Sequence, residues 1–212
     1  MVDATRALIR PPQQQRSRTS FERVLRAARE LLEEEGYQGF TLASVSRRAG
    51  VSVGAIYARA PSKDALFYAV HARVMEELNG IFARIARAPG DDALDSRELV
   101  REAVRRFAEP FRTHSAILRV VMHRGAVDDV VADLGSRSSS KEADLFREIV
   151  LARRAEIVHD DPELAVDVAY RMVYCTLARQ IMYGPTFESQ FRIAWDDLVR
   201  EIGNAAAAYL LG

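Results

Sequence analysis

Hydrophobic positions along this chain recur at the spacing of amphipathic helices. The first clear case covers about residues 19–35, where apolar side chains lie at i, i+3, i+4, i+7, i+10 and i+11. These positions are Phe21, Val24, Leu25, Ala28, Leu31 and Leu32. Thr19 and Glu22 have the form of a capping box before this segment, and Gly36 can end it. No segment has the alternation of a β-strand, so the pattern predicts an all-α fold.

Two short helices joined by a tight turn are predicted next. Thr41 is a good N-cap for a first helix, and Gly50 can end that helix in a left-handed conformation. Ser52 is the N-cap of a second helix over Val53–Arg59, which Pro61 closes. Two helices with a glycine-containing turn between them are typical of the helix-turn-helix of DNA-binding proteins.

Longer helical patterns fill the remainder of the chain. They cover about residues 62–88, 96–111, 116–122, 145–158, 163–183 and 188–211. The Gly135–Ser140 segment reads as a loop or as a break within one long helix. The last two helices are apolar on nearly all sides, and Gly203 with Ala205–Ala208 would let a partner helix approach closely. This pattern favours a four-helix dimer interface made from two copies of the pair.

Charge is unevenly distributed along the 212 residues, although the formal net charge is zero. Residues 1–65 contain 11 Lys and Arg against 7 Asp and Glu, whereas the remainder contains 19 against 23. A basic first part and an acidic remainder fit a DNA-binding domain followed by a body that does not contact DNA. The chain lacks an apolar run of about 18 residues and a signal-peptide core, so the cytoplasm is its expected location.

Residues around the predicted turn suit a phosphate backbone, because they offer cations, hydroxyls, small side chains and free helix N-termini. The candidate DNA-binding residues are Thr41, Arg47, Arg48, Ser52, Val53, Gly54, Ala55, Tyr57, Arg59 and Lys63. With its AGVS turn, its tyrosine at position 57 and the PSK that opens the next helix, this stretch resembles the helix-turn-helix of the TetR family of transcriptional regulators. The close match covers residues 19–70, and the body agrees with the family in length and helical character.

That resemblance implies a homodimeric regulator whose Val53–Arg59 helix enters the major groove of a palindromic operator. Tyr57, Thr41 and Lys63 would hold phosphates, and a small, largely apolar ligand would release the DNA by acting on the body. The helix over residues 62–88 would be the lever between them. The expected domains are a flexible arm at 1–17, a DNA-binding domain at 18–65, and a ligand-binding and dimerisation domain at 66–212. Candidate ligand contacts, for each of which core packing is the alternative, are Phe107, Phe111, Met122, His123, Phe146, Tyr170 and Tyr174.

Several positions depart from the family pattern. Ala43 stands where a base-reading arginine is frequent, and Ser44 replaces an acidic residue, which weakens the capping box. Val53 replaces a polar residue at the start of the recognition helix, and Ala60 replaces an aromatic one. Because that helix is poor in hydrogen-bonding side chains, specificity is expected to rest on Arg59, on the arginines before the turn, on apolar contacts with thymine methyl groups, and largely on DNA shape.

Other chemistry finds little support in the sequence. Glu156 and His159 match Glu-x-x-His, but a di-iron bundle needs a second such motif and two more glutamates, so a surface cluster is the expected reading. Cys175 stands among apolar neighbours and is expected in the core. We expect no cofactor, no metal and no catalytic residues. The alternatives are an all-α enzyme or small-molecule carrier with an incidental helix-turn-helix, and a helical dimerisation adaptor.

Overall fold

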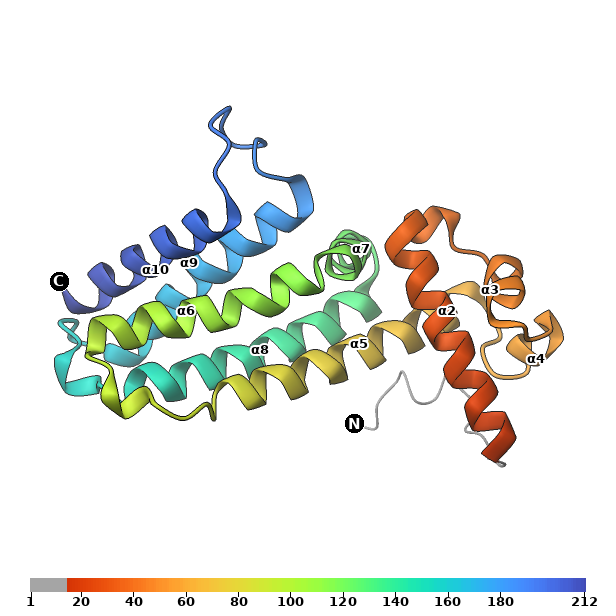
Figure 1. Cartoon of the computed structure of the whole chain (residues 1–212), viewed down its shortest axis with the longest axis horizontal. Helices are drawn as coiled ribbons and strands as arrows, with labels where there is room; N and C mark the ends of the chain where they lie inside the picture. Colours follow the sequence, from red (N-terminus) through yellow and green to blue (C-terminus); the bar gives the residue numbers. More distant parts are fainter. Residues whose placement is uncertain (1–14) are drawn as a thin grey trace. The chain divides into compact units, whose positions relative to one another are not determined.

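The computed structural model describes residues 15–212, and this part of the chain contains helices and no strand (Figure 1). Its elements are α2 (Gln15–Gly39), α3 (Leu42–Ala49), α4 (Val53–Tyr57), α5 (Lys63–Ile85), η1 (Asp91–Ala93), α6 (Ser96–Thr113), α7 (Ser115–Gly125), α8 (Asp129–Leu151), η2 (Arg154–Glu156), α9 (Pro162–Tyr183) and α10 (Trp195–Leu211). The all-α prediction is confirmed. Most of the expected arm, residues 1–14, lies outside the described residues. Helix α2 begins at Gln15, so Thr19 lies inside this helix instead of capping it.

By its internal contacts the chain divides into two compact units. Unit 1 contains the residues up to Glu77 together with Ala116–Gly135, and unit 2 contains Leu78–Ser115 together with Ser136–Gly212. Helices α5 and α8 therefore contribute residues to both units. The contacts group α7 and the start of α8 with the helix-turn-helix, a grouping that local sequence patterns do not reveal.

Unit 1 is built around α2 and α3, which pack against each other. Helix α2 is interrupted at Gly36, whose φ of 66° is accessible to glycine at little cost. This break directs Phe40 into the core, where it is fully buried together with Ile56 and Phe67. Tyr37 packs edge-on against Phe67, with ring centroids 5.2 Å apart. Aromatic contacts thus give the small three-helix domain a core that local helix propensity could not supply.

Unit 2 places α6 against α10 and α9 (Figure 1). Gly203 permits a close approach of α10 to α6, because a Cβ at this position would lie 3.5 Å from Cα of Arg101 and 3.7 Å from Cβ of Val104. The small residue therefore serves packing within one chain, whereas the sequence suggested a role between chains. Ala205 and Ala208 remain exposed.

The predicted loop over Gly135–Ser140 is wrong, because α8 continues through it from Asp129 to Leu151. The serine hydroxyls that suggested a loop find partners that are compatible with a helix. Ser140 donates to the carbonyl of Ser136 one turn earlier at 2.9 Å, and Ser138 donates to Asn79 of α5 at 2.9 Å. The Gly135–Ser140 segment therefore has a composition typical of loops but forms part of a helix that is rich in hydroxyls.

Two expectations for the C-terminal helices also need correction. Helix α10 begins at Trp195, about seven residues later than its apolar pattern suggested, and Cys175 is exposed. Asp161 caps α9 with Pro162 at its first position, and Gly184 follows its end. Cys175 lies on a face of α9 that residues 15–212 leave open to solvent. Between Gln15 and Gly212, no helix combines the length and apolar character needed to cross a membrane.

Candidate nucleic-acid interface and cavities

The first helix of the motif is capped at both ends. The hydroxyl of Thr41 accepts the N–H of Ser44 at 3.1 Å, and Ser44 Oγ accepts the N–H of Thr41 at 3.0 Å. This is a complete capping box, so the weakening expected from serine at this position does not occur. At the other end, Gly50 adopts φ 63° and ψ 37°, the left-handed conformation that the sequence predicts.

Ser46 stabilises the turn that follows. Its hydroxyl donates to the carbonyl of Val51 at 2.7 Å, and the N–H of Val51 donates to the carbonyl of Ser46 at 3.2 Å. The sequence analysis did not identify this role of Ser46. Ser52 then caps α4 by accepting the N–H of Ala55 at 3.3 Å. The path of the backbone between the two helices is therefore set by specific hydrogen bonds.

The second helix is shorter than predicted. Helix α4 covers Val53–Tyr57, and Arg59 lies in the turn after it. Pro61 disfavours a helical conformation at Ala60, so the helix must end before that residue. Ile56 and Ala60 are fully buried and anchor the segment to unit 1. Val53 and Tyr57 are 36% and 52% exposed, so the opposite side of this short helix faces solvent.

The predicted DNA-binding residues are all at least partly accessible, and we call this set the motif surface. Its exposed members are Thr41, Arg47, Arg48, Ser52, Val53, Gly54, Ala55 and Tyr57, and its half-buried members are Arg59 and Lys63. A Cβ at Gly54 would meet no atom within 4 Å, so the backbone at this point is open to a ligand.

Three of the four cations on this surface are oriented by neighbours. Arg48 pairs with Glu34 of α2 at 2.7 Å, Arg59 lies 5.9 Å from the ring centroid of Phe21, and Nζ of Lys63 lies 4.3 Å from that of Tyr37. Arg47 forms no ion pair within residues 15–212. Cation–π contacts restrict the long side chains while leaving their charge available.

A second polar cluster in unit 1 surrounds Arg124, near the end of α7. Its guanidinium lies 2.9 Å from Asp128 and 3.5 Å from Asp64, and it stacks over the ring of Tyr37. Tyr37 donates to Asp64, and Tyr68 donates to Asp128 at 3.0 Å. Burial and the hydrogen bond to Asp64 raise the pKa of the Tyr37 hydroxyl to about 12. We call this set the Arg124 cluster, and in it each carboxylate has a cation and a phenol as partners.

Five of the predicted ligand residues form one aromatic cluster in unit 2, and two lie elsewhere. Phe107 and Phe146 have ring centroids 5.5 Å apart, Phe146 and Tyr170 5.7 Å, and Phe111 and Tyr174 5.5 Å. Met122 and His123 belong to α7 of unit 1, and His123 is exposed.

The sequence analysis missed Glu142, a carboxyl group in contact with this aromatic cluster. Its side chain is on α8, is only 6% exposed, and lies 3.4 Å from both Ser138 Oγ and the Tyr170 hydroxyl. Burial raises the pKa of Glu142 to about 7. The signal that could have found it is spacing: Ser138, Glu142 and Phe146 follow one another at intervals of four on one helix face.

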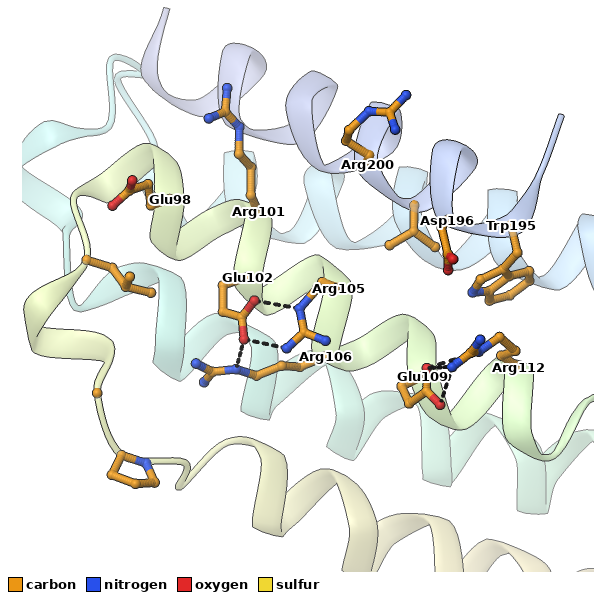
Figure 2. Close-up of a pocket in the computed structure, with 14 residues that line it drawn as sticks. Glu98, Arg101, Glu102, Arg105, Arg106, Glu109, Arg112, Trp195, Asp196 and Arg200 are labelled. Atoms are coloured by element: carbon orange, nitrogen blue, oxygen red, sulfur yellow. Dashed lines mark hydrogen bonds and ion pairs between the residues drawn. The ribbon is translucent and has the colours of Figure 1, made fainter.

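Two larger grooves and a smaller one of about 140 Å³ open on unit 2. The first larger groove, of about 570 Å³, lies between α8 and α9 and is lined in part by Ser139, Tyr170, Tyr174 and Cys175. The second, of about 600 Å³, is lined by residues of α6 and α10 and by the loop before α6. Figure 2 shows this second groove, with charged side chains along α6 and with Trp195 and Asp196 on α10.

Most charges in the second groove are already paired. Glu102 bonds to Arg105 at 2.6 Å and to Arg106 at 2.7 Å, and Glu109 pairs with Arg112 at 2.8 Å (Figure 2). These ion pairs hold the pKa of Glu102 down to about 2, the hydrogen bond from Arg105 being the largest influence. A ligand would have to break exposed pairs to reach these groups, so this groove offers a weaker polar anchor than the first.

The Glu-x-x-His pair is not arranged for a metal. Glu156 lies in the short η2 element, and Nε2 of His159 contacts the carbonyl oxygen of Tyr209. His71 is buried beside Phe67, and burial lowers its pKa to about 4, so it is neutral. Within the described range, no group of three or more His, Cys, Asp or Glu side chains is placed to hold a metal ion.

The motif surface and the helices that follow it define the class of fold: a helix-turn-helix domain with a helical body. Residues 24–70 match the family model described as bacterial regulatory proteins, tetR family. No curated protein sequence matches the chain.

Solved structures with the same fold cover nearly the whole chain. Salmonella enterica GusR is 19% identical with a TM-score of 0.66, and the match covers 91% of this chain and 95% of GusR. A regulatory protein in the tetR family from Rhodococcus RHA1 is 16% identical with a TM-score of 0.65, covering 90% and 96% of the two chains. A TetR-like transcriptional regulator from the same source is 22% identical with a TM-score of 0.59, covering 93% and 96%. At these identities the likeness shows the fold. The protein therefore has the N-terminal domain of the tetR family of bacterial regulators, within a chain that has the fold of TetR-family regulators.

Proposed function

We propose that this protein is a homodimeric, one-component transcriptional repressor that a small, largely apolar ligand releases from a palindromic operator. The observation that carries the proposal is the motif surface: a capped helix, a left-handed glycine turn and a short helix that exposes Tyr57, with cations on both sides. This arrangement offers a duplex hydroxyl and guanidinium donors at phosphate-contact positions. In this role the protein needs neither a catalytic group nor a cofactor.

Sequence discrimination by this surface would come mainly from DNA shape. The exposed part of α4 presents Val53, Gly54, Ala55 and Tyr57, of which only tyrosine can form a side-chain hydrogen bond. Arg59 lies over Phe21 after the helix, where it can contact the backbone or a base edge. A scan of single base substitutions should therefore spread the loss of affinity over many positions, including base pairs that are not contacted. A scan in which a few base pairs carry nearly all the discrimination would contradict this part of the proposal.

The dimer would form through α9 and α10. Helix α9 carries a stripe of residues at helical spacing, which we call the α9 stripe: the exposed Leu164, Met172 and Cys175 and the half-buried Val168. Leu164 is 60% exposed and Met172 is 43% exposed, which is costly for a face left in water. A second copy of the same helix pair would cover both stripes around a two-fold axis.

Release of the operator requires that the ligand prefer one conformation of the dimer. A ligand shifts the equilibrium only by its differential affinity, so it must favour the conformer whose two motif surfaces do not match half-sites roughly 34–36 Å apart. Two features are suited to transmit this preference: α5, which contributes residues to both units, and the Arg124 cluster, which holds the end of α7 within unit 1.

A gel-shift titration with the DNA that flanks the protein's own gene, repeated at two salt concentrations, tests the proposal. A regulator should show saturable binding that weakens steeply with salt, because phosphate contacts release counterions. The carrier or enzyme alternative predicts ligand binding or turnover without duplex affinity, and an adaptor predicts neither.

A further inference from the structure

Glu142 is an acidic side chain in a place where its charge is poorly stabilised. It is 6% exposed on α8 and makes no ion pair with any Lys, Arg or His between residues 15 and 212. Its hydrogen-bond partners are the hydroxyls of Ser138 and Tyr170, each at 3.4 Å, a long distance for such a bond. Burial of a carboxylate without a cation is unfavourable, so Glu142 does not serve the stability of the fold.

The two hydroxyl protons that reach Glu142 are also shared with other acceptors. Ser138 Oγ lies 2.9 Å from Oδ1 of Asn79, and the Tyr170 hydroxyl lies 3.3 Å from the carbonyl oxygen of Ser139. Each hydroxyl has a single proton, and both alternative acceptors are closer than the carboxyl group. The cluster therefore holds more hydrogen-bond acceptors than these two protons can satisfy. A molecule with several N–H donors and a positive charge would satisfy the remaining acceptors.

Aromatic rings surround this group of acceptors. Phe146 lies one turn after Glu142 on α8, and its ring centroid is 5.5 Å from that of Phe107 and 5.7 Å from that of Tyr170. The ring centroids of Tyr170 and Tyr174 are 5.9 Å apart. Ring faces attract cations and also accommodate an apolar body, so the surroundings fit a molecule that has both features.

The groove between α8 and α9 adjoins this cluster, and Glu142 lies behind Tyr170, one of the residues that line the groove. Tyr170 and Tyr174 line the groove, and the same two side chains bond to Glu142 and to Ser139. The groove volume of about 570 Å³ is within the range of small-molecule sites. The other charges at its rim are balanced, because Arg147 pairs with Asp144 at 2.8 Å and Arg171 with Asp167 at 2.6 Å.

We propose that this groove, with Glu142 beneath its two tyrosines, is a binding site for a small organic amine that has an aromatic or alkyl body and one protonated nitrogen. The ammonium group would displace the Tyr170 hydroxyl from Glu142 and pair with the carboxylate behind it. The body would lie against Tyr170 and Tyr174, which line the groove. This inference rests on the proposed function, in which the amine is the effector.

The site should bind amines more weakly at low pH. Ser138 of α8, Asn79 of α5 and Tyr170 of α9 face Glu142, and none of them is charged at neutral pH. Burial raises the pKa of Glu142 to about 7, so protonation removes the carboxylate below that pH. An amine that stays protonated throughout should therefore bind about tenfold more weakly at pH 6 than at pH 8.

Calorimetric titration of the full chain with matched amines and alcohols tests the site. The probes are tryptamine with tryptophol, phenethylamine with phenethyl alcohol, and dodecylamine with dodecanol. At least one amine should bind the wild-type protein about tenfold or more tightly than its alcohol, and Glu142→Gln should abolish that preference. The control is Glu148→Gln, which neutralises an exposed glutamate on the same helix and should leave the preference unchanged.

A second variant covers the case in which Glu142→Gln does not fold. Tyr170→Phe keeps the ring and removes the hydroxyl beside the carboxylate, so it should change the preference for amines while alcohols bind as before. Equal binding of amine and alcohol, absence of binding by all three amines, or an unchanged preference in both folded variants would each overturn the site. Binding to the DNA duplex is measured separately, without amine. If the protein does not bind the duplex, the proposed function is contradicted. If it binds the duplex but no amine, only this inference is overturned.

Discussion

The two units treat acidic groups in opposite ways. In unit 1, the half-exposed Asp64 and the buried Asp128 share the guanidinium of Arg124, and each accepts a hydrogen bond from a tyrosine. In unit 2, the buried Glu142 has two neutral partners at long distance and no cation among residues 15–212. A paired cluster of this kind holds elements together, whereas an unpaired acidic group in an aromatic environment is a candidate for ligand recognition.

The outer surfaces of the units differ in a complementary way. Unit 1 exposes cations and hydroxyls around α3 and α4, and unit 2 exposes the apolar α9 stripe. Exposed cations and hydroxyls can bind the phosphates of a duplex, and an exposed apolar stripe can pack against the same helices of a second copy. Under the proposed function each surface has a different partner, and substitutions on each surface test that proposal.

The largest effect is expected when the paired cluster is broken. Arg124→Met leaves Asp128 without its cation, and the side chain of Asp128 is only 7% exposed. The free energy of unfolding should fall by about 3 kcal/mol, because an uncompensated buried charge remains. Chemical denaturation measures this change. Arg73→Met, which removes one member of an exposed pair on α5, should change the stability by less than about 0.5 kcal/mol. Equal losses of stability in the two variants would show that the Arg124 cluster contributes no more than an exposed ion pair.

Glu142→Gln should change the free energy of unfolding in the opposite direction to Arg124→Met. Because the pKa of Glu142 is raised, the folded protein favours the protonated side chain. The group therefore contributes stability below pH 4.5, the pKa of this group in the unfolded chain, and this contribution is lost as the pH rises through about 7. The variant should be more stable than the wild type by about 2 kcal/mol at pH 8 and nearly equal to it at pH 5, since a buried amide retains part of the desolvation cost. Chemical denaturation of both proteins at pH 5 and at pH 8 measures this difference in stability. A variant that is less stable at pH 8 would show that Glu142 is a structural group.

Met172→Glu should disrupt the dimer by placing a charge in the middle of the α9 stripe. We expect dimer association to weaken by at least about 2 kcal/mol, which is roughly thirtyfold in Kd. Sedimentation equilibrium provides the measurement, and Lys141→Glu, at an exposed site on α8, is the control. An unchanged association constant would exclude this stripe from the interface.

Tyr57→Phe should weaken duplex binding by about 1 kcal/mol for all sequences alike, since a lost phosphate contact carries no base preference. Fluorescence anisotropy with specific and unrelated duplexes measures both affinities. Tyr183→Phe in unit 2 serves as the control, because this exposed tyrosine lies far along the chain from the motif. If the affinity is unchanged, the Tyr57 hydroxyl does not contact phosphate.

The smallest expected effect is a change in the salt dependence. Lys63→Gln should reduce the slope of the logarithm of affinity against the logarithm of salt concentration by about one unit, the value expected for one lost phosphate contact. The chain's only other lysine, Lys141, lies on α8 in unit 2, so Lys141→Gln is a matched control. The account of Lys63 fails if the two variants show the same slope.

Features fixed by local chemistry could be predicted from the sequence. The caps at Thr41 and Ser52 and the left-handed Gly50 depend on a few neighbouring residues, and the structure has each of them. The candidate DNA-binding residues were found together because they lie within one short segment.

Features that depend on distant partners could not be predicted in this way. The serine-rich part of α8 is helical because Ser138 reaches Asn79, 59 residues earlier in the chain. Glu142 stands between Lys141 and Asp144 in the sequence and is buried only because α9 covers it with Tyr170. Cys175 has apolar neighbours in the sequence, yet it lies on the exposed α9 stripe.

Hydroxyl-radical footprinting of the DNA that flanks the gene tests the central claim, that two copies of the motif surface contact one duplex. We expect two protected patches on one side of the helix, related by symmetry and separated by about one helical turn. A single protected patch, or none at low salt, would contradict the claim.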